Sequence, residues 1–229
     1  MASIKFILTD IEGTTTSVSF VYDVLFPYFA KHAQRYIQAH LEDLEVLDLL
    51  EEVKKTVLEE DDKEINYDAA LEKLLYWNRV DRKHPALKTL QGQVWQEGYT
   101  SGEIKGHVYE DVPPMLKKWH KAGIQLGVYS SGSVAAQQLI FGKSIAGDLT
   151  TLFSLYFDTR IGHKREIQSY RNIQMAIDLP ASQILFLSDV EEELDAALEA
   201  GFQTLQLVRE RTHPSNKHTF VHSFKEIKL

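Results

Sequence analysis

The sequence contains no cysteine, which excludes disulfide bridges, thiolate metal sites and cysteine nucleophiles and is compatible with a reducing compartment. It also lacks any apolar run near the ~18 residues that a membrane-spanning helix needs. The apolar stretch from Ile4 to Leu8 runs into Asp10 without the pattern of a cleavable signal. We therefore expect a soluble, cytoplasmic protein that does not enter a membrane.

Acidic residues outnumber basic ones, and the formal net charge is -8 at pH 7. Nucleic acid and anionic membranes would be repelled at long range, which argues against either as the main partner. An anionic substrate would therefore need local positive charge. The sequence also lacks internal repeats, low-complexity tracts and a linker rich in glycine or serine. With 229 residues, 44% of them hydrophobic, we expect a monomer with one core domain and a smaller insertion.

The apolar residues between about 18 and 100 recur at helical spacing, so we expect this stretch to be wholly helical. Further along the chain, helices and short apolar strands alternate. The expected strands are 4 to 9, 124 to 129, 152 to 157, 184 to 187 and 204 to 208. The expected helices run from 111 to 123, onward from 134, from 164 to 177, and up to 200.

Strands that alternate with helices indicate a parallel sheet covered on both faces. The helical block separates the first strand from the others, so we interpret the block as an insertion. We expect an α/β protein whose Rossmann-like parallel sheet core comprises residues 1-15 and 106-229, with an inserted all-helical cap at residues 16-105. We expect the cap to act as a lid over a bound ligand.

Polar residues gather where the expected strands end, which is where parallel sheets bind their ligands. Two acids follow the first strand, a serine follows the second, a lysine opens a later helix and a third acid follows the strand at 184. These residues are Asp10, Glu12, Ser130, Lys164 and Asp189. Sheet topology alone would bring them together from distant positions in the sequence.

Each of these residues also has a structural explanation when it is taken alone. An Asp-x-Glu-Gly segment is commonly a turn with solvated acids, and the Ser-Ser-Gly-Ser segment at 130 to 133 is commonly a helix N-cap. Lys164 could be exposed, and Asp189 could complement a helix N-terminus. Independent explanations do not predict their joint placement at strand ends, so we favour an active site.

This order of motifs resembles the haloacid dehalogenase-like phosphatases, which carry a strand-end Asp-x-Asp-x-Thr, a strand-end Ser or Thr, a lysine and a strand-end acid. Glu12 stands where most members have aspartate. With that departure, the segments DIEGTTTSVSFVYDVLFPY, DRKHPALKTLQGQVWQEGY, YSSGS, GHK and FLSDV resemble the enolase-phosphatase family, the acireductone synthases. The second segment lies in the cap, and because caps differ between families it makes the resemblance specific.

The resemblance implies a phosphatase and enolase of methionine salvage that converts 2,3-diketo-5-methylthiopentyl 1-phosphate to acireductone (1,2-dihydroxy-3-keto-5-methylthiopentene) and phosphate. Asp10, a carboxylate at a strand tip, would be the nucleophile that forms an aspartyl phosphate. Glu12 lies on the same side of an extended backbone, and it would protonate the leaving oxygen and then deprotonate the attacking water. Lys164 would supply fixed positive charge to the phosphoryl oxygens.

The resemblance also implies one Mg2+ per subunit, a hard cation that suits carboxylates and water. Its ligands would be Asp10, Asp189 and the backbone carbonyl of Glu12. Ser130 would donate a hydrogen bond to the substrate phosphate, and backbone N–H groups at the Ser131 turn would add further donors.

Three further residues have weaker support. Glu193 is expected either to hold a metal-bound water, to orient Lys164, or to act only as an acid in the first turn of a helix. His218 and His222 are four residues apart, and we favour ordinary surface histidines over a metal pair.

Within the expected cap, Lys88, Gln91 and Trp95 share one helical face, being spaced by three and four residues. Trp95 is more typical of a core residue than of a substrate contact. Lys88 is our candidate for a specificity contact.

Two other classes of function remain open. The first is a different enzyme on the same scaffold, either a dehalogenase or a phosphatase for another small phosphorylated metabolite such as a sugar phosphate. Glu12 argues against the dehalogenase, which needs no acid for a leaving group at that position. The second is a non-catalytic protein that binds phosphate or a partner, and the joint presence of nucleophile, acid, lysine and metal acid argues against it.

Overall fold

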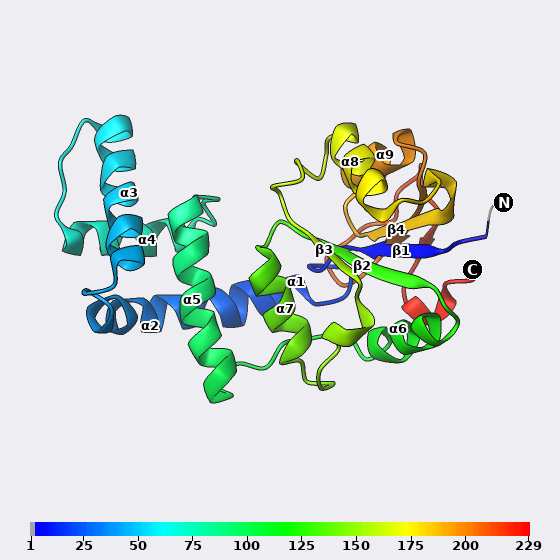
Figure 1. Ribbon diagram of the computed structural model, residues 1–229, viewed down its shortest axis with the longest axis horizontal. Coiled ribbons are helices and arrows are strands. Elements are labelled where there is room, and N and C mark those ends of the chain that lie inside the picture. Colours follow the sequence, from blue (N-terminus) through cyan, green and yellow to red (C-terminus); the bar gives the residue numbers. More distant parts are fainter. Residues whose placement is uncertain (1–2) are drawn as a thin grey trace. The chain divides into compact units, whose positions relative to one another are not determined.

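The computed structural model describes residues 3–229 and divides the chain into two compact units (Figure 1). One unit comprises Met1–Val18 and Lys105–Leu229, and the other comprises Ser19–Ile104. The first unit is therefore discontinuous in sequence, and the second is a single continuous segment. The two boundaries of the helical segment expected from the sequence lie between residues 15 and 16 and between residues 105 and 106. That this segment acts as a lid stays a prediction.

A parallel sheet in the order β3-β2-β1-β4-β5-β6 forms the centre of the discontinuous unit. Its strands are β1 (Phe6–Thr9), β2 (Gln125–Tyr129), β3 (Leu155–Phe157), β4 (Ile184–Ser188), β5 (Gln203–Leu207) and β6 (Phe220–Val221). Its helices are α6 (Val112–Lys121), α7 (Val134–Gly142), α8 (Ile167–Ile177) and α9 (Glu191–Glu199). The predicted α/β fold with a parallel sheet is confirmed.

Helices cover the sheet because β1 is apolar toward both faces. Phe6 and Leu8 pack into one buried cluster with residues of α8 and α9, including Tyr170 and Leu194, whereas Ile7 between them is equally buried. Figure 1 shows α8 and α9 on one side of the sheet and α6 on the other. The centre of the sheet is therefore withdrawn from water, and its strand ends remain as the place for polar chemistry.

The order of the strands creates a switch point beside β1. The chain proceeds from β1 to β2 and β3 on one side, and then returns to place β4, β5 and β6 on the other side. Thr9, the last residue of β1, is in register with Val128 of β2 and Leu187 of β4. The residues that follow these three strands therefore emerge at the same edge of the sheet.

The continuous unit is helical. Its elements are α1 (Val18–Phe20), which begins at the unit boundary, a π-helical turn (Val21–Leu25), α2 (Phe26–Ala39), α3 (Leu44–Asp61), α4 (Tyr67–Arg79) and α5 (Pro85–Ser101). Asp43 and Asn66 cap the N-termini of α3 and α4 through side-chain oxygens, and Pro85 opens α5. The prediction that this stretch is helical is confirmed.

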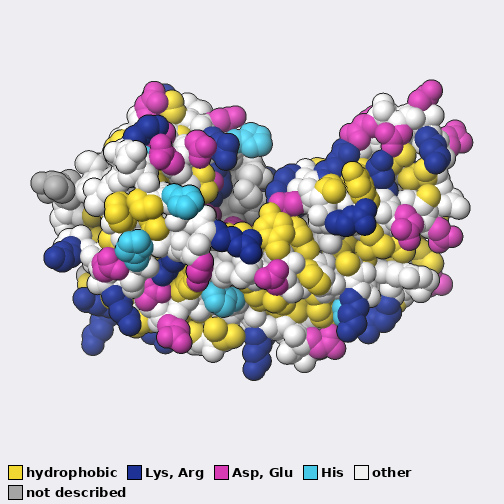
Figure 2. Space-filling view, turned by 180° about the vertical axis from the view of Figure 1, so that it is seen from behind, with side chains coloured by type: hydrophobic (Ala, Val, Ile, Leu, Met, Phe, Trp, Pro, Cys, Tyr) yellow, Lys and Arg dark blue, Asp and Glu magenta, His cyan; other side chains and the backbone are white. Residues whose placement is uncertain are grey.

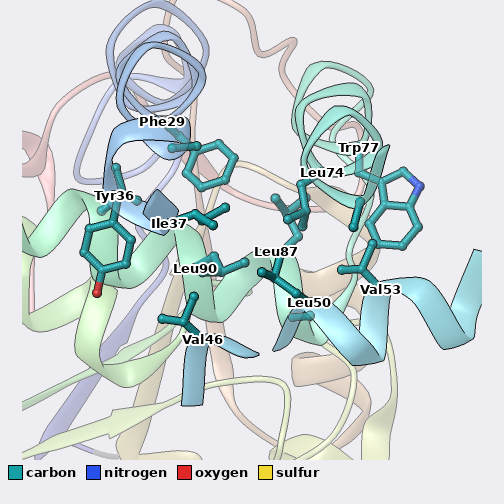
Figure 3. Close-up of a cluster of buried hydrophobic side chains, with 14 of the residues drawn as sticks. Phe29, Tyr36, Ile37, Val46, Leu50, Val53, Leu74, Trp77, Leu87 and Leu90 are labelled. Carbon is teal, nitrogen blue, oxygen red and sulfur yellow. The ribbon is translucent and has the colours of Figure 1, made fainter. Parts of the chain in front are cut away.

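A buried apolar cluster holds α2 to α5 together (Figure 3). The cluster includes Phe29, Leu50, Leu74, Trp77 and Leu90, each at most 1% exposed. These residues recur at helical spacing along their own helices, which explains why the periodicity was readable in the sequence.

The three residues expected on one face of α5 differ in how deeply they lie in this unit. Gln91 donates from Nε2 to Oδ1 of Asn78, and Asn78 donates in turn to the carbonyl of Phe26. The indole N–H of Trp95 donates to the carbonyl of Leu25, so Trp95 is a core residue, as its residue type suggested. Lys88 is partly buried, and its function as a specificity contact stays a prediction.

The predicted helix start at Lys164 is wrong, because α8 begins at Ile167. Lys164 lies in a loop whose backbone is held by side chains of α8. Ser169 donates from Oγ to the carbonyl of His163, and Tyr170 donates from its hydroxyl to the carbonyl of Lys164. The expected strand at 152 to 157 is also shorter, since residues 150–152 form a 3-10 turn before β3.

No helix within residues 3–229 is long and apolar enough to cross a membrane. On the face that Figure 2 draws, basic and acidic side chains are interspersed, so the negative net charge is not gathered into one patch there.

Candidate active site

The switch point brings the strand-end residues together. Asp10 follows β1 directly, and its backbone N–H donates to the carbonyl of Leu187 in β4 at 2.9 Å. Ser130 follows β2, and Asp189 follows β4. Asp10 and Ser130 are only 3% and 0% exposed, so these groups lie at the floor of the sheet edge and not in the surrounding solvent.

Lys164 forms the centre of the site. Its Nζ lies 2.5 Å from Oδ1 of Asp10 and 2.7 Å from Oε2 of Glu193. Ser188 donates from Oγ to the same Oε2 at 2.9 Å. All of these side chains are buried, and the contact between Glu193 and Lys164 agrees with one of the alternatives that the sequence left open, that Glu193 orients the lysine.

A tight loop carries the opening motif. The backbone N–H groups of Thr14, Thr15 and Thr16 all donate to the carbonyl of Ile11, and Gly13 donates to the carbonyl of Thr16. Gly13 has a φ of +75°, a conformation that favours glycine. A Cβ atom there would lie 2.2 Å from Oδ2 of Asp189. The loop therefore packs the backbone of Gly13 directly against the carboxylate of Asp189.

Glu12 and Ser130 contact each other across the site. Ser130 donates from Oγ to Oε2 of Glu12 at 3.1 Å, and the backbone N–H of Gly132 donates to Ser130 Oγ at 3.1 Å. The adjacent Ser131 is exposed, and Ser133 caps α7 by accepting from the N–H of Ala136. The Ser-Ser-Gly-Ser segment thus both caps a helix and contributes a side chain to the site.

The two carboxylate oxygens of Asp189 differ in their hydrogen bonding. Thr212 donates from Oγ1 to its Oδ2 at 3.2 Å. Its Oδ1 is buried and has no hydrogen-bond partner within residues 3–229. Burial, followed by the nearby charge of Glu193, raises the pKa of Asp189 to about 6. A buried acceptor without a donor is costly, which makes Oδ1 a candidate ligand atom for a cation.

The charges of the site do not balance. Burial is the main cause that raises the pKa of Asp10, Lys164 opposes it, and the charges of Glu193, Glu12 and Asp189 raise it further. Burial by itself would lower the pKa of Lys164, but Asp10 and Glu193 outweigh burial and raise it. Several carboxylates thus surround a single lysine, and a bound cation would offset their excess negative charge.

The donor set fits a hard divalent cation. Within residues 3–229, no group of three or more acidic, histidine or cysteine side chains converges as a complete metal site. Two side chains, Asp10 and Asp189, are instead available beside the backbone of the 10–13 loop. Mg2+ is usually held by one or two carboxylates with waters and substrate oxygens completing its shell, so this sparse set suits it.

The histidine pair lies outside the site. His218 is buried, and it bonds through Nε2 to Asp195 and through Nδ1 to Thr204. His222 bonds through Nδ1 to the carbonyl of Val208. The expectation that His218 is a surface residue is therefore wrong, because the segment before β6 folds over α9 and β5.

Two residues that contact the site gave no signal in the sequence. Thr212 supports Asp189, and Arg209 donates to the backbone carbonyl of Thr14. Both follow β5, in the segment Val-Arg-Glu-Arg-Thr at 208–212, which matches none of the motifs used in the sequence analysis. Only the three-dimensional packing of the segment after β5 against the 10–16 loop shows their relation to the site.

Comparison with known proteins agrees with this geometry. The family model described as haloacid dehalogenase-like hydrolase matches residues 4–201. The chain is 51% identical over 224 residues to "Enolase-phosphatase E1" of Picosynechococcus sp., covering 98% of each sequence. It is 54% identical over 208 residues to the protein of the same name from Pseudomonas fluorescens, covering 91% of this chain and 90% of that one.

Solved structures show the same fold. The UTR4 protein from Saccharomyces cerevisiae matches with a TM-score of 0.79 and 36% identity, covering 98% of this chain and 100% of the other. CbbY from Rhodobacter sphaeroides matches with a TM-score of 0.61 at 16% identity, covering 97% and 96%, and supports the fold alone. By sequence and by structure, the chain belongs to the haloacid dehalogenase-like hydrolases and, within them, to the enolase-phosphatase family.

Proposed function

We propose that this protein converts 2,3-diketo-5-methylthiopentyl 1-phosphate to acireductone and phosphate with the help of Mg2+. The single observation that carries the proposal is the buried contact between Asp10 Oδ1 and Lys164 Nζ at 2.5 Å, beside the unpaired Oδ1 of Asp189. Similarity to curated enolase-phosphatases supports the choice of substrate. The alternative is a phosphatase of the same superfamily that acts on another small phosphorylated metabolite.

The first chemical step is enolisation. The carboxylate of Glu12 takes a proton from C1 of the substrate and keeps it for the second step. The electron pair of that C–H bond forms the C1=C2 double bond, and the carbonyl oxygen at C2 accepts the displaced pair and a proton from solvent, which Glu12 returns to solvent after the final hydrolysis. Ser130 Oγ donates to Glu12 Oε2, so this carboxylate is held at the strand edge. Glu12 is our candidate for this base because it is the carboxylate of the motif that is not paired with Lys164.

The second step transfers the phosphoryl group. A carboxylate oxygen of Asp10 attacks phosphorus, the bond to the enol oxygen breaks, and Glu12 protonates that oxygen as it leaves. Water activated by Glu12 then attacks the aspartyl phosphate, which releases phosphate and restores the carboxylate of Asp10. Lys164 enters the reaction protonated, because Asp10 and Glu193 raise its pKa, and its charge stabilises negative charge on the phosphoryl oxygens.

Haloacid dehalogenase-like hydrolases and enolase-phosphatases generally use Mg2+. In this chain Asp10, Asp189 and the backbone carbonyl of Glu12 would hold one ion per subunit. When bound, the ion supplies Lewis-acid stabilisation of phosphoryl oxygens. Ser130 and the backbone N–H groups at Ser131 would bind the phosphate, and both assignments remain proposals.

The test is turnover of the diketone phosphate by the purified protein. Absorbance of the enediol product and a coupled phosphate assay follow the two half-reactions separately. We expect EDTA to abolish turnover and Mg2+ to restore it, whereas Ca2+ should inhibit because it is larger and less strict in its geometry. Full activity after exhaustive chelation would contradict the metal, and turnover of other phosphate esters in preference to the diketone would favour the alternative.

A further inference from the structure

The segment after β5 contains an arginine that reaches the loop of the opening motif. Arg209 donates from Nη2 to the backbone carbonyl of Thr14 at 3.2 Å and from Nε to the same oxygen at 3.4 Å. Its side chain is only 9% exposed. A buried arginine normally has a specific set of acceptors, and here one of them is a main-chain atom four residues after Asp10.

Three further groups hold the guanidinium of Arg209 in place. Its Cζ lies 4.1 Å from the ring centroid of Tyr109, and Nη2 lies 3.0 Å from Oδ2 of Asp111. Nη1 donates to the carbonyl of His222 at 3.0 Å. Because stacking and several acceptors define the plane of the guanidinium, its position does not depend on the loop that it contacts.

Asp111 is itself anchored to the C-terminal segment. Its Oδ2 accepts from the hydroxyl of Ser223 at 2.9 Å and from the backbone N–H of Phe224 at 2.6 Å. Arg209 therefore connects the 10–16 loop to a rigid group of residues at the start of α6 and at the end of the chain. The backbone N–H of Tyr109 also donates to the carbonyl of Thr15, so two successive carbonyls of the loop are held.

The held carbonyl belongs to the part of the loop that sets the spacing of the two acids. Thr14 directly follows Gly13, where a Cβ atom would lie 2.2 Å from Asp189 Oδ2. A shift of the loop by an ångström at Thr14 would be transmitted to Gly13, and with it to the distance between Asp10 and Asp189. Small displacements of this kind can reduce catalysis by about 100-fold.

We propose that Arg209 is a positioning residue, which holds the 10–16 loop so that Asp10 and Asp189 keep the spacing needed for the cation and the phosphoryl group. The inference rests on the proposed function of Asp10 as nucleophile. Arg209 acts on the main chain of the loop and has no direct contact with the reacting atoms. Its loss should therefore affect kcat and metal affinity more than KM.

The experiment compares Arg209→Ala, Arg209→Lys and Asp111→Asn in the full-length protein. Lysine keeps the positive charge, but a single ammonium cannot bond Thr14, Asp111 and His222 together. We expect both Arg209 variants to lower kcat by about 10- to 100-fold and to raise the Mg2+ dissociation constant measured by calorimetry, with KM nearly unchanged. Millimolar guanidinium should restore part of the lost kcat in Arg209→Ala.

Asp111→Asn is the matched control. It removes a charge from the same buried group but keeps an acceptor oxygen for Arg209 and the bonds between Arg209 and Thr14, so kcat and Mg2+ affinity should fall less than in Arg209→Lys even if stability falls. Equal losses in Asp111→Asn and Arg209→Lys would show a purely structural function and overturn the proposal. Unchanged kcat and Mg2+ affinity in both Arg209 variants would overturn it as well.

The proposed function and the proposed positioning can fail separately. If the unmodified protein does not turn over the diketone phosphate, the substrate assignment is wrong. Calorimetric Mg2+ affinity and hydrolysis of an aryl phosphate still report on Arg209, because neither depends on the identity of the natural substrate.

Discussion

The two units of the molecule bury polar groups in opposite ways. The α/β unit buries formal charges, with Lys164 between Asp10 and Glu193 and with Arg209 against Asp111. In the helical unit, the buried polar contacts described above join neutral groups, such as the amides of Asn78 and Gln91. Its ion pairs lie at the surface, for example between Lys73 and Asp61, whose side chains are 26% and 48% exposed.

This difference shows where stability and activity reside. Removing charges from water is costly, and a buried ion pair is weak evidence for stability. We therefore propose that the charges buried around Lys164 serve chemistry, whereas the apolar cluster of α2 to α5 stabilises the fold. Changes in the two units should accordingly separate loss of activity from loss of stability.

The largest expected effect is the loss of activity in Asp10→Asn. The variant lacks the nucleophile, so phosphate release should fall by about four to six powers of ten. Slow enolisation should persist, because Glu12 and an amide oxygen at position 10 remain. Phosphate release and enediol absorbance are measured in parallel with thermal unfolding. Normal phosphate release, once mass spectrometry has excluded deamidation, would refute the aspartyl phosphate.

The second effect concerns stability in the helical unit. Leu74 is fully buried in the cluster, so Leu74→Ala should lower the free energy of unfolding by about 2–5 kcal/mol. Leu58→Ala is the control, since Leu58 is 43% exposed on α3 and should change little. Urea denaturation followed by circular dichroism measures both. Equal losses in the two variants would contradict the assignment of this cluster as the main source of stability.

The third effect is a dependence of stability on pH at Asp111. Burial raises its pKa, but hydrogen bonds from Arg209 and Phe224 outweigh burial, so the folded pKa lies below the ordinary value of 3.8. The stabilisation is therefore complete above that value and is lost as the pH falls through the folded pKa. Asp111→Asn should lower the free energy of unfolding by about 1–3 kcal/mol at neutral pH, with the difference shrinking below about pH 4. Denaturation at several pH values tests this, and a difference that grows in acid would contradict it.

The smallest effect is expected at the surface of the helical unit. Lys73→Gln removes the pair with Asp61, which is 2.7 Å long but solvent-accessible, and should cost about 0.2–1 kcal/mol. The loss should shrink in high salt, because exposed charges are screened. A loss above that of Leu74→Ala would reverse the comparison between the two units. Denaturation in low and high salt provides the measurement.

Much of the fold was readable from the sequence because the relevant signals are local. The helical spacing of residues such as Leu50 and Leu74 indicated the helical unit, and apolar strands that end in polar residues indicated the parallel sheet. The meeting of Asp10 and Asp189 at one sheet edge follows from the topology of parallel strands. The chemical roles of these residues stay proposals.

Other features depend on contacts between distant segments and could not be predicted. The helix expected at Lys164 starts later because residues 163–166 form a turn, in which the carbonyls of His163 and Lys164 accept from Ser169 and Tyr170. Arg209 and Thr212 contribute to the site only through the packing of the segment after β5. His218 is buried because its partner Asp195 lies on α9, a relation that no local spacing records.

The discontinuity of the α/β unit has a consequence for how the protein emerges from a ribosome. Strand β1 is made before the helical unit, yet its partners begin at Gln125 in β2 and Ile184 in β4. At about 5–20 residues per second, synthesis of the intervening chain to β2 takes on the order of ten seconds. The helical unit is complete and continuous by then, so it can fold while the apolar strand β1 has no partner strand. Chaperones that protect nascent chains would therefore be needed most at β1.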